Sequence, residues 1–399
     1  PRRMATDAAA PRRQSTRFPL LYARASAGGA IAYVPFLTLL LPARMAELAG
    51  AADVEWLGYS TFLGAVAASI GGIVFGWLSD RTGDRRGWIA GGLLLAILLL
   101  LAVPLAKDVT ALVAIIVAWQ LALNMMLGPL AAWGGDLVPD EQKGLLGGLL
   151  ALSPALGAWS GALVTLPGVV SLEQRLVVIA ALMALAILPA LLAGRPQPFP
   201  ELIQREAEGE AAKQPAQPAV RMWLARLLVQ IAEAALFAYL YFWFRSIDPA
   251  MGDHEKAGIF SIALTIAVPV ALLAGRWADR NDRPFTPLIL AAALSSVGLV
   301  GMALAGDAAS AKAAYLGFGI ATTVFLSLHS GQMLRVLPRP ERRGRDLGLF
   351  NLTNTIPSLI MPWLTISLVP SFGFGTLFLL LAGLAGCAVL LLATLPRRA

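Results

Sequence analysis

Residues 76–87 read Gly-Trp-Leu-Ser-Asp-Arg-Thr-Gly-Asp-Arg-Arg-Gly, a short charged stretch between two apolar runs that are each long enough to cross a bilayer. A related stretch, Gly275-Arg-Trp-Ala-Asp-Arg-Asn-Asp-Arg283, follows about half a chain later. Glycine lets helices approach closely and turn sharply, and arginine and aspartate hold a hairpin at a membrane surface. The two stretches predict equivalent charged connections between membrane spans.

The composition is that of a membrane protein. Of the 399 residues, 58% are hydrophobic and only 14% are charged, and the mean hydropathy is +0.72. A soluble domain carries roughly 25% charged residues and cannot hide this much apolar surface. The apolar residues fall in blocks of about 20, the length that crosses ~30 Å of hydrocarbon. The first block is too long for the apolar part of a signal peptide and lacks a small-residue cleavage site after it, so we expect a retained helix.

Twelve spans follow from these blocks, and we expect an all-α polytopic membrane protein. The spans are predicted at 18–41, 56–78, 88–105, 110–134, 144–166, 174–193, 222–245, 257–276, 285–305, 311–333, 346–369 and 373–395. Most of the 31 Lys and Arg residues flank alternate span ends, as the positive-inside rule requires. This distribution explains the net charge of +7 without nucleic acid binding, and it places both termini in the cytoplasm. The single Cys387, in the last block, leaves no disulfide framework and no cysteine-based metal site.

The chain repeats at half its length. Arg24 and Arg226, Gly76 and Gly275, and Gly144 and Gly344 are separated by a nearly constant offset of about 200 residues. We therefore expect two pseudo-symmetric six-helix bundles, at 18–193 and 222–395. Residues 194–221 are rich in Pro and Glu and predict a cytoplasmic linker with a short surface helix around 201–212. Residues 1–17 and 396–399 are expected to be a disordered N-terminus and a cytoplasmic tail.

The motif and the repeat together resemble the major facilitator superfamily, over nearly the whole chain. The order Gly-x-Leu-Ser-Asp-Arg-x-Gly-x-Arg in 76–85 resembles the loop between the second and third helices of these transporters. The resemblance implies the major facilitator fold, with a substrate site between the halves near the middle of the bilayer. It further implies a secondary transporter of a bacterial inner (plasma) membrane that works by alternating access.

Three stretches look like the glycoside-cation symporter and sucrose-transporter group. They are the seventh span around Arg226 with the aromatic residues that follow it, residues 336–354 with Pro357 and Pro362, and residues 136–144. In melibiose-type members, the coupling cation is held by aspartates within helices two and four. Here the second span has no aspartate, and the only acid of the fourth, Asp136, lies at its cytoplasmic end. Proton coupling is therefore expected rather than sodium coupling.

Glu233 is the candidate for proton coupling, because it is the one carboxylate well inside a predicted span. Ionisable groups within a membrane are costly, and burial away from a cation favours the protonated acid. The alternative is a structural acid that stays neutral or pairs with an arginine.

Polar and aromatic side chains within spans are candidates for substrate contact. A guanidinium binds carboxylates, phosphates and hydroxyls, and amides bind hydroxyl-rich ligands without the cost of a charge. The candidates are Arg24, Tyr33, Trp119, Gln120, Asn124, Tyr239, His329, Gln332, Asn351 and Asn354. The alternatives are snorkelling for Arg24, hydrogen bonds between helices for the amides and His329, and packing for the aromatic residues.

The charged connections predict a cytoplasmic gate. By the family resemblance, Asp80 should interact with the N-terminus of helix eleven, where a helix dipole favours an anion. Arg85 and Arg86 are expected to pair with Asp136, Asp140 or Glu141, and exposed ion pairs are weak enough to open. The gate comprises Gly76, Asp80, Arg81, Gly83, Arg85, Arg86, Asp136, Glu141, Asp279 and Arg280. The alternative is a charge cluster that only sets topology.

We expect a monomeric carrier that brings in a sugar, a glycoside or a similar small polar solute with protons. No phosphate-binding glycine loop and no metal-spaced histidines are present, so the proton gradient, with no cofactor, is the expected driving force. An enzyme is disfavoured, because no nucleophile–base pair is visible. A drug or metabolite exporter and a non-transporting assembly factor or sensor remain as alternatives.

Overall fold

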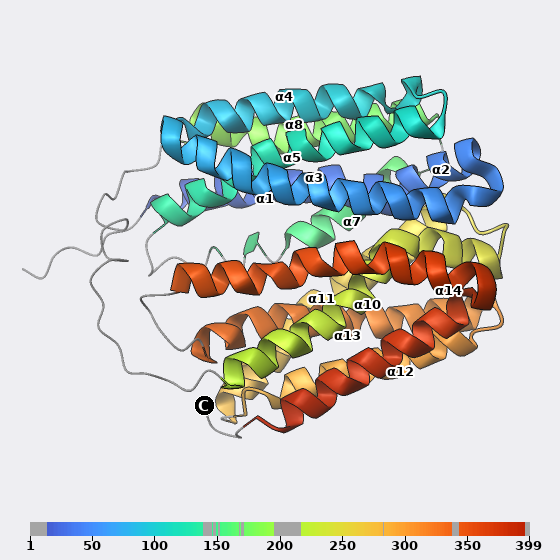
Figure 1. Ribbon diagram of the computed structural model, residues 1–399. Helices are drawn as coiled ribbons and strands as arrows, with labels where there is room; N and C mark the ends of the chain where they lie inside the picture. Colours follow the sequence, from blue (N-terminus) through green and yellow to red (C-terminus); the bar gives the residue numbers. More distant parts are fainter. Residues whose placement is uncertain are drawn as a thin grey trace, which may run out of the picture.

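The computed structural model describes residues 14–138, 146, 149–150, 152–166, 168, 171–194, 217–281, 283–336 and 343–395. The predicted linker helix at 201–212, most of the predicted N-terminal segment and the tail lie outside these residues. Throughout the described ranges, the regular structure is helical. Figure 1 shows two groups of helices, one from each half of the chain, with long axes running between the same two ends of the molecule.

The N-terminal half comprises the longer helices α1 (Arg17–Pro35), α3 (Asp53–Thr82), α4 (Arg85–Ala102), α5 (Val109–Leu137), α7 (Ser153–Val164) and α8 (Leu172–Ala193). Short elements connect them: a π-helical turn at Phe36–Leu40, α2 at Leu41–Ala49, and 3-10 turns at Gly50–Ala52 and Val103–Leu105. The C-terminal half comprises α10 (Gln217–Ile247), α11 (Asp253–Arg280), α12 (Thr286–Leu304), α13 (Ala308–Val336) and α14 (Arg343–Ala393).

These helices account for the twelve predicted spans. Nine helical stretches of the described residues are long and apolar enough to cross a membrane. Two of them hold two spans each: Arg17–Thr82 turns at Gly50–Ala52, and Leu352–Ala393 turns at Gly373. The remaining span is α7, whose 12 residues fall below the length of the others. At Gly373, φ is 74° and ψ is 173°, a conformation that a side chain would oppose, and α14 folds back there (Figure 1).

The quoted charged stretch is mostly helix, in contrast to the predicted surface loop. α3 continues through Thr82, and only Gly83 and Asp84 separate it from α4. Gly83 ends α3 with a φ of 67° and an N–H bond to the carbonyl of Ser79. The Asp84 carboxylate then accepts from the N–H of Gly87 and caps α4. A left-handed glycine followed directly by a capping aspartate needs no further residues to reverse the chain.

Within each half, a glycine lets two neighbouring helices cross at close range. In the N-terminal half, Gly92 of α4 lies so close to α5 that a Cβ would sit 2.5 Å from the backbone nitrogen of Met126. In the C-terminal half, a Cβ on Gly298 of α12 would sit 2.8 Å from the backbone nitrogen of Phe318 in α13. Small residues at helix crossings let backbones approach within a membrane. The equivalent crossings support the predicted internal repeat.

The outside of the bundle is apolar. Large hydrophobic side chains are exposed along the outer helices, including Leu94 and Leu98 of α4, Leu185 of α8, and Leu290 and Leu294 of α12. A soluble protein rarely exposes so much apolar surface. This surface suits the hydrocarbon of a bilayer.

Candidate functional site

A cavity of about 960 Å³ lies between the two halves. Its walls come from α1, α3 and α5 of the N-terminal half and from α10 and α14 of the C-terminal half. Both bundles therefore contribute to one chamber, as a carrier with a central site requires.

Five of the residues singled out in the sequence line this cavity. They are Tyr33 of α1, Gln120 and Asn124 of α5, Glu233 of α10 and Asn354 of α14. Gln120 and Asn124 lie one turn apart, and the Asn124 amide donates to the Gln120 carbonyl at 2.9 Å. Their side chains thus occupy the same face of α5, next to Gly64 and Gly71 of α3.

Four other candidates are buried and do not line the cavity. Trp119 is fully buried, and its ring meets that of Phe36 edge-on, with the centroids 4.8 Å apart. Tyr239 is 2% exposed and packs in the core of the N-terminal half, across the interface from its own helix. His329 is fully buried with Nε2 2.9 Å from the carbonyl oxygen of Met222, and Gln332 is buried on the same helix.

Arg24 lies on the outer side of α1. Its guanidinium is exposed and donates to the carbonyl of Leu185 in α8 at 2.9 Å. It does not line the cavity. This position agrees with the snorkelling alternative, in which the guanidinium finds its hydrogen-bond partners at the outside of the bundle. The side chain of Asn351 lies outside what the structure describes.

Several cavity residues were not singled out in the sequence. Hydroxyl and amide side chains from three helices complete the lining: Ser60, Thr61, Ser69, Gln230, Thr355 and Ser358. The sequence held a signal for them. Ser60, Thr61 and Ser69 are polar residues within the apolar second span, and Gln230 lies one helical turn before Glu233 and so shares its helix face. Hydroxyl residues are common in membrane helices, where they also bond to their own backbone, so this signal is weak alone.

Glu233 is the one acid that lines the cavity among the described residues, and no Lys, Arg or His joins it there. Its carboxylate accepts a hydrogen bond from the Gln230 amide at 2.9 Å. Tyr33, across the interface, lines the same part of the cavity, and its ring lies 6.1 Å from that of Phe237. The acid thus faces both the cavity and the opposite half.

Arg226 bonds to the neighbouring helices α13 and α14 and does not line the cavity. Its guanidinium donates to the hydroxyl of Thr353 at 3.1 Å, to the carbonyl of Leu326 at 3.1 Å and to the side-chain oxygen of Asn354 at 3.3 Å. These bonds tie α10 to α13 and α14. Because Asn354 lines the cavity, Arg226 positions one polar wall of the chamber.

Among the described gate residues, Asp80, Arg85 and Arg86 have partners within the N-terminal half. Arg85 pairs with Asp80 at 2.8 Å and donates to the Ser79 hydroxyl at 3.1 Å. Arg86 donates to the carbonyls of Leu191 and Gly194. Arg81 lies over the ring of Trp77, and Arg280 is exposed at the end of α11. Gly76 borders open space, Gly83 forms the cap described above, and Glu141 and the side chains of Asp136 and Asp279 lie outside the described residues.

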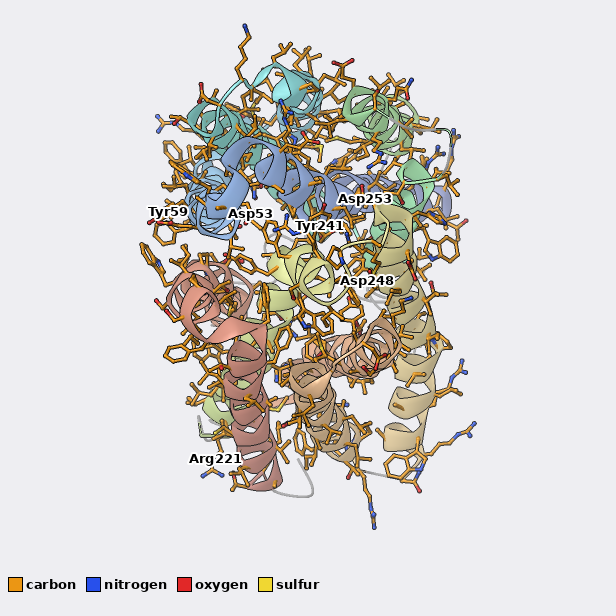
Figure 2. The ribbon with its side chains drawn as sticks, turned by 90° about the vertical axis from the view of Figure 1, so that its right-hand side faces the viewer. Asp53, Tyr59, Arg221, Tyr241, Asp248 and Asp253 are labelled. Atoms are coloured by element: carbon orange, nitrogen blue, oxygen red, sulfur yellow. The ribbon has the colours of Figure 1, made fainter. Side chains whose placement is uncertain are left out.

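The end of the molecule away from the described termini carries polar contacts that join the halves. Arg245 of α10 pairs with Asp53 of α3 at 2.5 Å, and Arg175 of α8 pairs with Asp253 of α11 at 2.8 Å. The Ser261 hydroxyl donates to the Ala158 carbonyl at 2.9 Å. Figure 2 views the molecule from this end, with Asp53, Tyr241 and Asp253 near the boundary between the halves. We call these three contacts the far-end latch.

Aromatic rings support the latch. The guanidinium of Arg245 lies 4.6 Å from the centroid of the Phe242 ring, and the amine of Lys256 lies 4.1 Å from that of Tyr241. Such cation–π contacts are worth ~0.5–2 kcal/mol each, depending on burial. The latch was not predicted from the sequence. There, the basic residues at this end were used only to assign the outer side of the membrane.

Residues 20–338 match the Major Facilitator Superfamily. The chain belongs to this family. A similar solved structure is that of a bacterial homologue of the human lysosomal transporter Spinster, in an inward-facing and unoccupied conformation. It is 14% identical, the alignment covers 94% of both chains, and the TM-score is 0.65. This likeness supports the facilitator fold. No curated protein sequence matches the chain.

The family decides the class of activity. The chain is a membrane transporter of the facilitator fold and not an enzyme. These matches identify the superfamily and do not distinguish the sucrose and glycoside carriers from its other members.

Proposed function

We propose that the chain carries a sugar, a glycoside or a similar small polar solute across the membrane together with protons, by alternating access. The observation that carries this proposal is the lining of the central cavity. Uncharged amides and hydroxyls from both halves line it, interspersed with aliphatic and small side chains, and one carboxylate lies among them. No organic cofactor enters the proposal, because the proton gradient supplies the driving force.

The polar lining suits a ligand with many hydroxyls. Gln120 and Asn124 face the cavity from one half, and Gln230, Asn354 and Ser358 face it from the other. Amides and hydroxyls both donate and accept hydrogen bonds, so they match sugar hydroxyls in either role. Tyr33 and Phe237 add aromatic surface against which the apolar face of a sugar ring can pack.

Glu233 is the proposed proton site. Loss of hydration when the chamber closes favours the neutral form of a carboxylate. Arg226, two turns earlier on α10, interacts with Glu233 and favours the charged form, so rocking of the halves can shift the balance between the two. The proton then leaves when the chamber opens to the opposite side. Residues of both halves border this acid, so rocking of the halves changes its surroundings.

The far-end latch and the gate motif supply two ends that open in turn. In the proposed cycle, the latch closes the outer end while the end with the termini is open, and the Asp80 motif closes that inner end after the halves rock. We propose that Asp80 and Asp279 then meet helix N-termini of the opposite half, with Arg81, Arg85, Arg86 and Arg280 around them. This proposal places both termini in the cytoplasm and a monomer in the plasma membrane.

Transport of a polar solute fits the lining better than drug export. Export of drugs favours a wide cavity lined by aromatic residues and methionine, whereas Met361 is the one methionine among the described lining residues. A protein that no longer transports should have tightly packed halves. The 960 Å³ chamber argues against that alternative.

The test is solute-driven proton movement in proteoliposomes across a panel of sugars and glycosides. External alkalinisation on adding one sugar is expected for the wild type and should be lost in Glu233→Gln, which keeps the size of the side chain. Glu47→Gln is the control, because Glu47 is an exposed acid paired with Arg44 at the far end. Coupled movement that survives Glu233→Gln would place the proton elsewhere, and silence across the panel would contradict the proposed function.

A further inference from the structure

A second, smaller pocket of about 130 Å³ opens beside the central cavity. Val34 of α1 and Pro154 of α7 border it from the N-terminal half, and α10, α11 and α13 enclose it from the C-terminal half. Tyr33, Glu233 and Phe237 line both spaces. The pocket is therefore a side chamber of the central cavity, with the proposed proton site at the boundary.

The side pocket differs from the central cavity in its lining. Aromatic and aliphatic side chains dominate it: Leu236, Phe237, Phe260, Leu264, Tyr315 and Phe318. The hydroxyl of Thr322 is already paired with that of Ser295, 3.0 Å away in α12. The amides of the central cavity do not reach it. A sugar hydroxyl would lose its hydrogen bonds to water on entering this pocket, at a cost in free energy, whereas an apolar group has no such bonds to lose.

Its size matches one aromatic ring. An apolar cavity of ~150 Å³ lined by leucine, isoleucine and phenylalanine binds benzene in another protein. The rings of Phe237, Phe260 and Phe318 come from three different helices, an arrangement that offers edge and face contacts to a guest ring. The side pocket is too small for a second sugar beside the one in the central cavity.

We propose that the side pocket receives the aryl group of a glycoside whose sugar occupies the central cavity. The inference rests on the proposed function and narrows it: the preferred solutes are aryl glycosides rather than free sugars or alkyl glycosides. The glycosidic oxygen then lies near Glu233 and Phe237, where the two spaces adjoin. Solute selection thereby divides between a polar compartment for the sugar and an apolar one for the aglycone.

The test compares matched methyl and phenyl glycosides of glucose and galactose, in competition for transport by proteoliposomes. Burial of a phenyl ring in place of a methyl group should tighten apparent binding by about 5- to 30-fold. Gly319→Leu fills the side pocket without touching the central cavity, because Gly319 lines only the smaller space. It should remove the phenyl preference and leave the methyl glycoside within about twofold of its wild-type affinity.

A matched control lies two residues away on the same helix. Gly317 borders open space, so Gly317→Leu adds the same side chain outside the pocket and should keep the preference. A Cβ on Gly319 would lie 3.2 Å from that of Ala263, so a variant with the opposite effect guards against misfolding. Phe260→Ala enlarges the pocket and should raise the affinity for a naphthyl glycoside relative to the phenyl one.

The outcomes separate the two proposals. If methyl and phenyl glycosides are carried equally well, or if Gly319→Leu keeps the phenyl preference, the side pocket does not bind the aglycone, while sugar transport stands. If Gly319→Leu slows proton coupling for both glycosides alike, the pocket serves water or the proton instead, and the inference is again overturned. If no glycoside is carried, the proposed function fails, and this inference fails with it.

Discussion

The two ends of the molecule differ in what their charges hold together. At the far end, Arg245–Asp53 and Arg175–Asp253 each cross from one half to the other. At the end with the charged motif, Asp80 and Arg86 bond to residues of their own half. Similar charge clusters at span ends therefore join different parts of the molecule. The far-end cluster joins the two halves, and the motif cluster joins neighbouring helices of one bundle.

Burial sharpens the difference. The side chain of Asp53 is 9% exposed, whereas that of Asp80 is 62% exposed. An exposed ion pair contributes ~0–1 kcal/mol, while removing one member of a buried pair costs ~3–5 kcal/mol. The latch should therefore control how often the far end opens.

Locking the far end should abolish transport. In a Cys387→Ser background, the pair Ala158→Cys and Ser261→Cys joins α7 to α11 where the Ser261 hydroxyl reaches the Ala158 carbonyl. Oxidation should stop turnover, and dithiothreitol should restore it, because alternating access requires the halves to separate here. Each single cysteine variant is the control, and full transport by the oxidised double variant would contradict the latch.

Breaking the deeper ion pair should open the far end more often. Arg245→Gln leaves Asp53 without its guanidinium, and because Arg245 itself is 35% exposed the expected cost is about 1–3 kcal/mol, roughly a 5- to 150-fold shift. The measure is the rate at which an impermeant maleimide labels Thr61→Cys, a partly exposed position that lines the central cavity, again in the Cys387→Ser background. Lys312→Gln is the matched control, since its partner Glu255 belongs to the same half. An equal rise in both variants would argue against the latch.

The second ion pair should matter less. Arg175 and Asp253 are 19% and 27% exposed, so water screens both partners, and Arg175→Gln should cost about 0.5–2 kcal/mol. Labelling of Thr61→Cys should rise by roughly 2- to 30-fold, and added salt should raise labelling in the same direction when Arg175 is kept. A larger effect than that of Arg245→Gln would reverse the proposed order of the two pairs.

Asp80→Asn should leave far-end opening nearly unchanged, within about twofold, because the described partner of this exposed acid lies in its own half. Turnover should nevertheless fall well below wild type while solute affinity is kept, if the motif closes the opposite end during the cycle. Arg81→Gln serves for comparison, because Arg81 lies over Trp77 outside the ion pair. Equal losses of affinity and turnover in Asp80→Asn would count against a gating role.

The span pattern and the two-half organisation were predictable because both depend only on the order of residues along the chain. Bilayer thickness fixes the length of an apolar block, and the repeats of Gly76 and Arg24 at Gly275 and Arg226 are visible by comparison of the halves. Sequence likewise marked Glu233, since an acid inside an apolar block is costly. Its place at the border of the central cavity and the side pocket comes from the structure.

The direction in which each polar side chain points was not predictable in the same way. Trp119 and Gln120 are neighbours in sequence, yet one is buried within the N-terminal bundle and the other lines the cavity. Arg24 and Arg226 occupy equivalent positions of the repeat, but Arg24 is exposed at α8 and Arg226 is buried against α13 and α14.

The membrane class, the span lengths, the repeat and the acid within the seventh span all follow from the order of residues alone. The tertiary structure decided which polar residues share a chamber, which charges cross between the halves, and where an apolar side pocket opens. The physical reason is that lipid and bundle interior are both apolar, so a span shows little periodic contrast between its two faces. Only the packing of helices against one another distinguishes the face that meets lipid from the face that meets the solute.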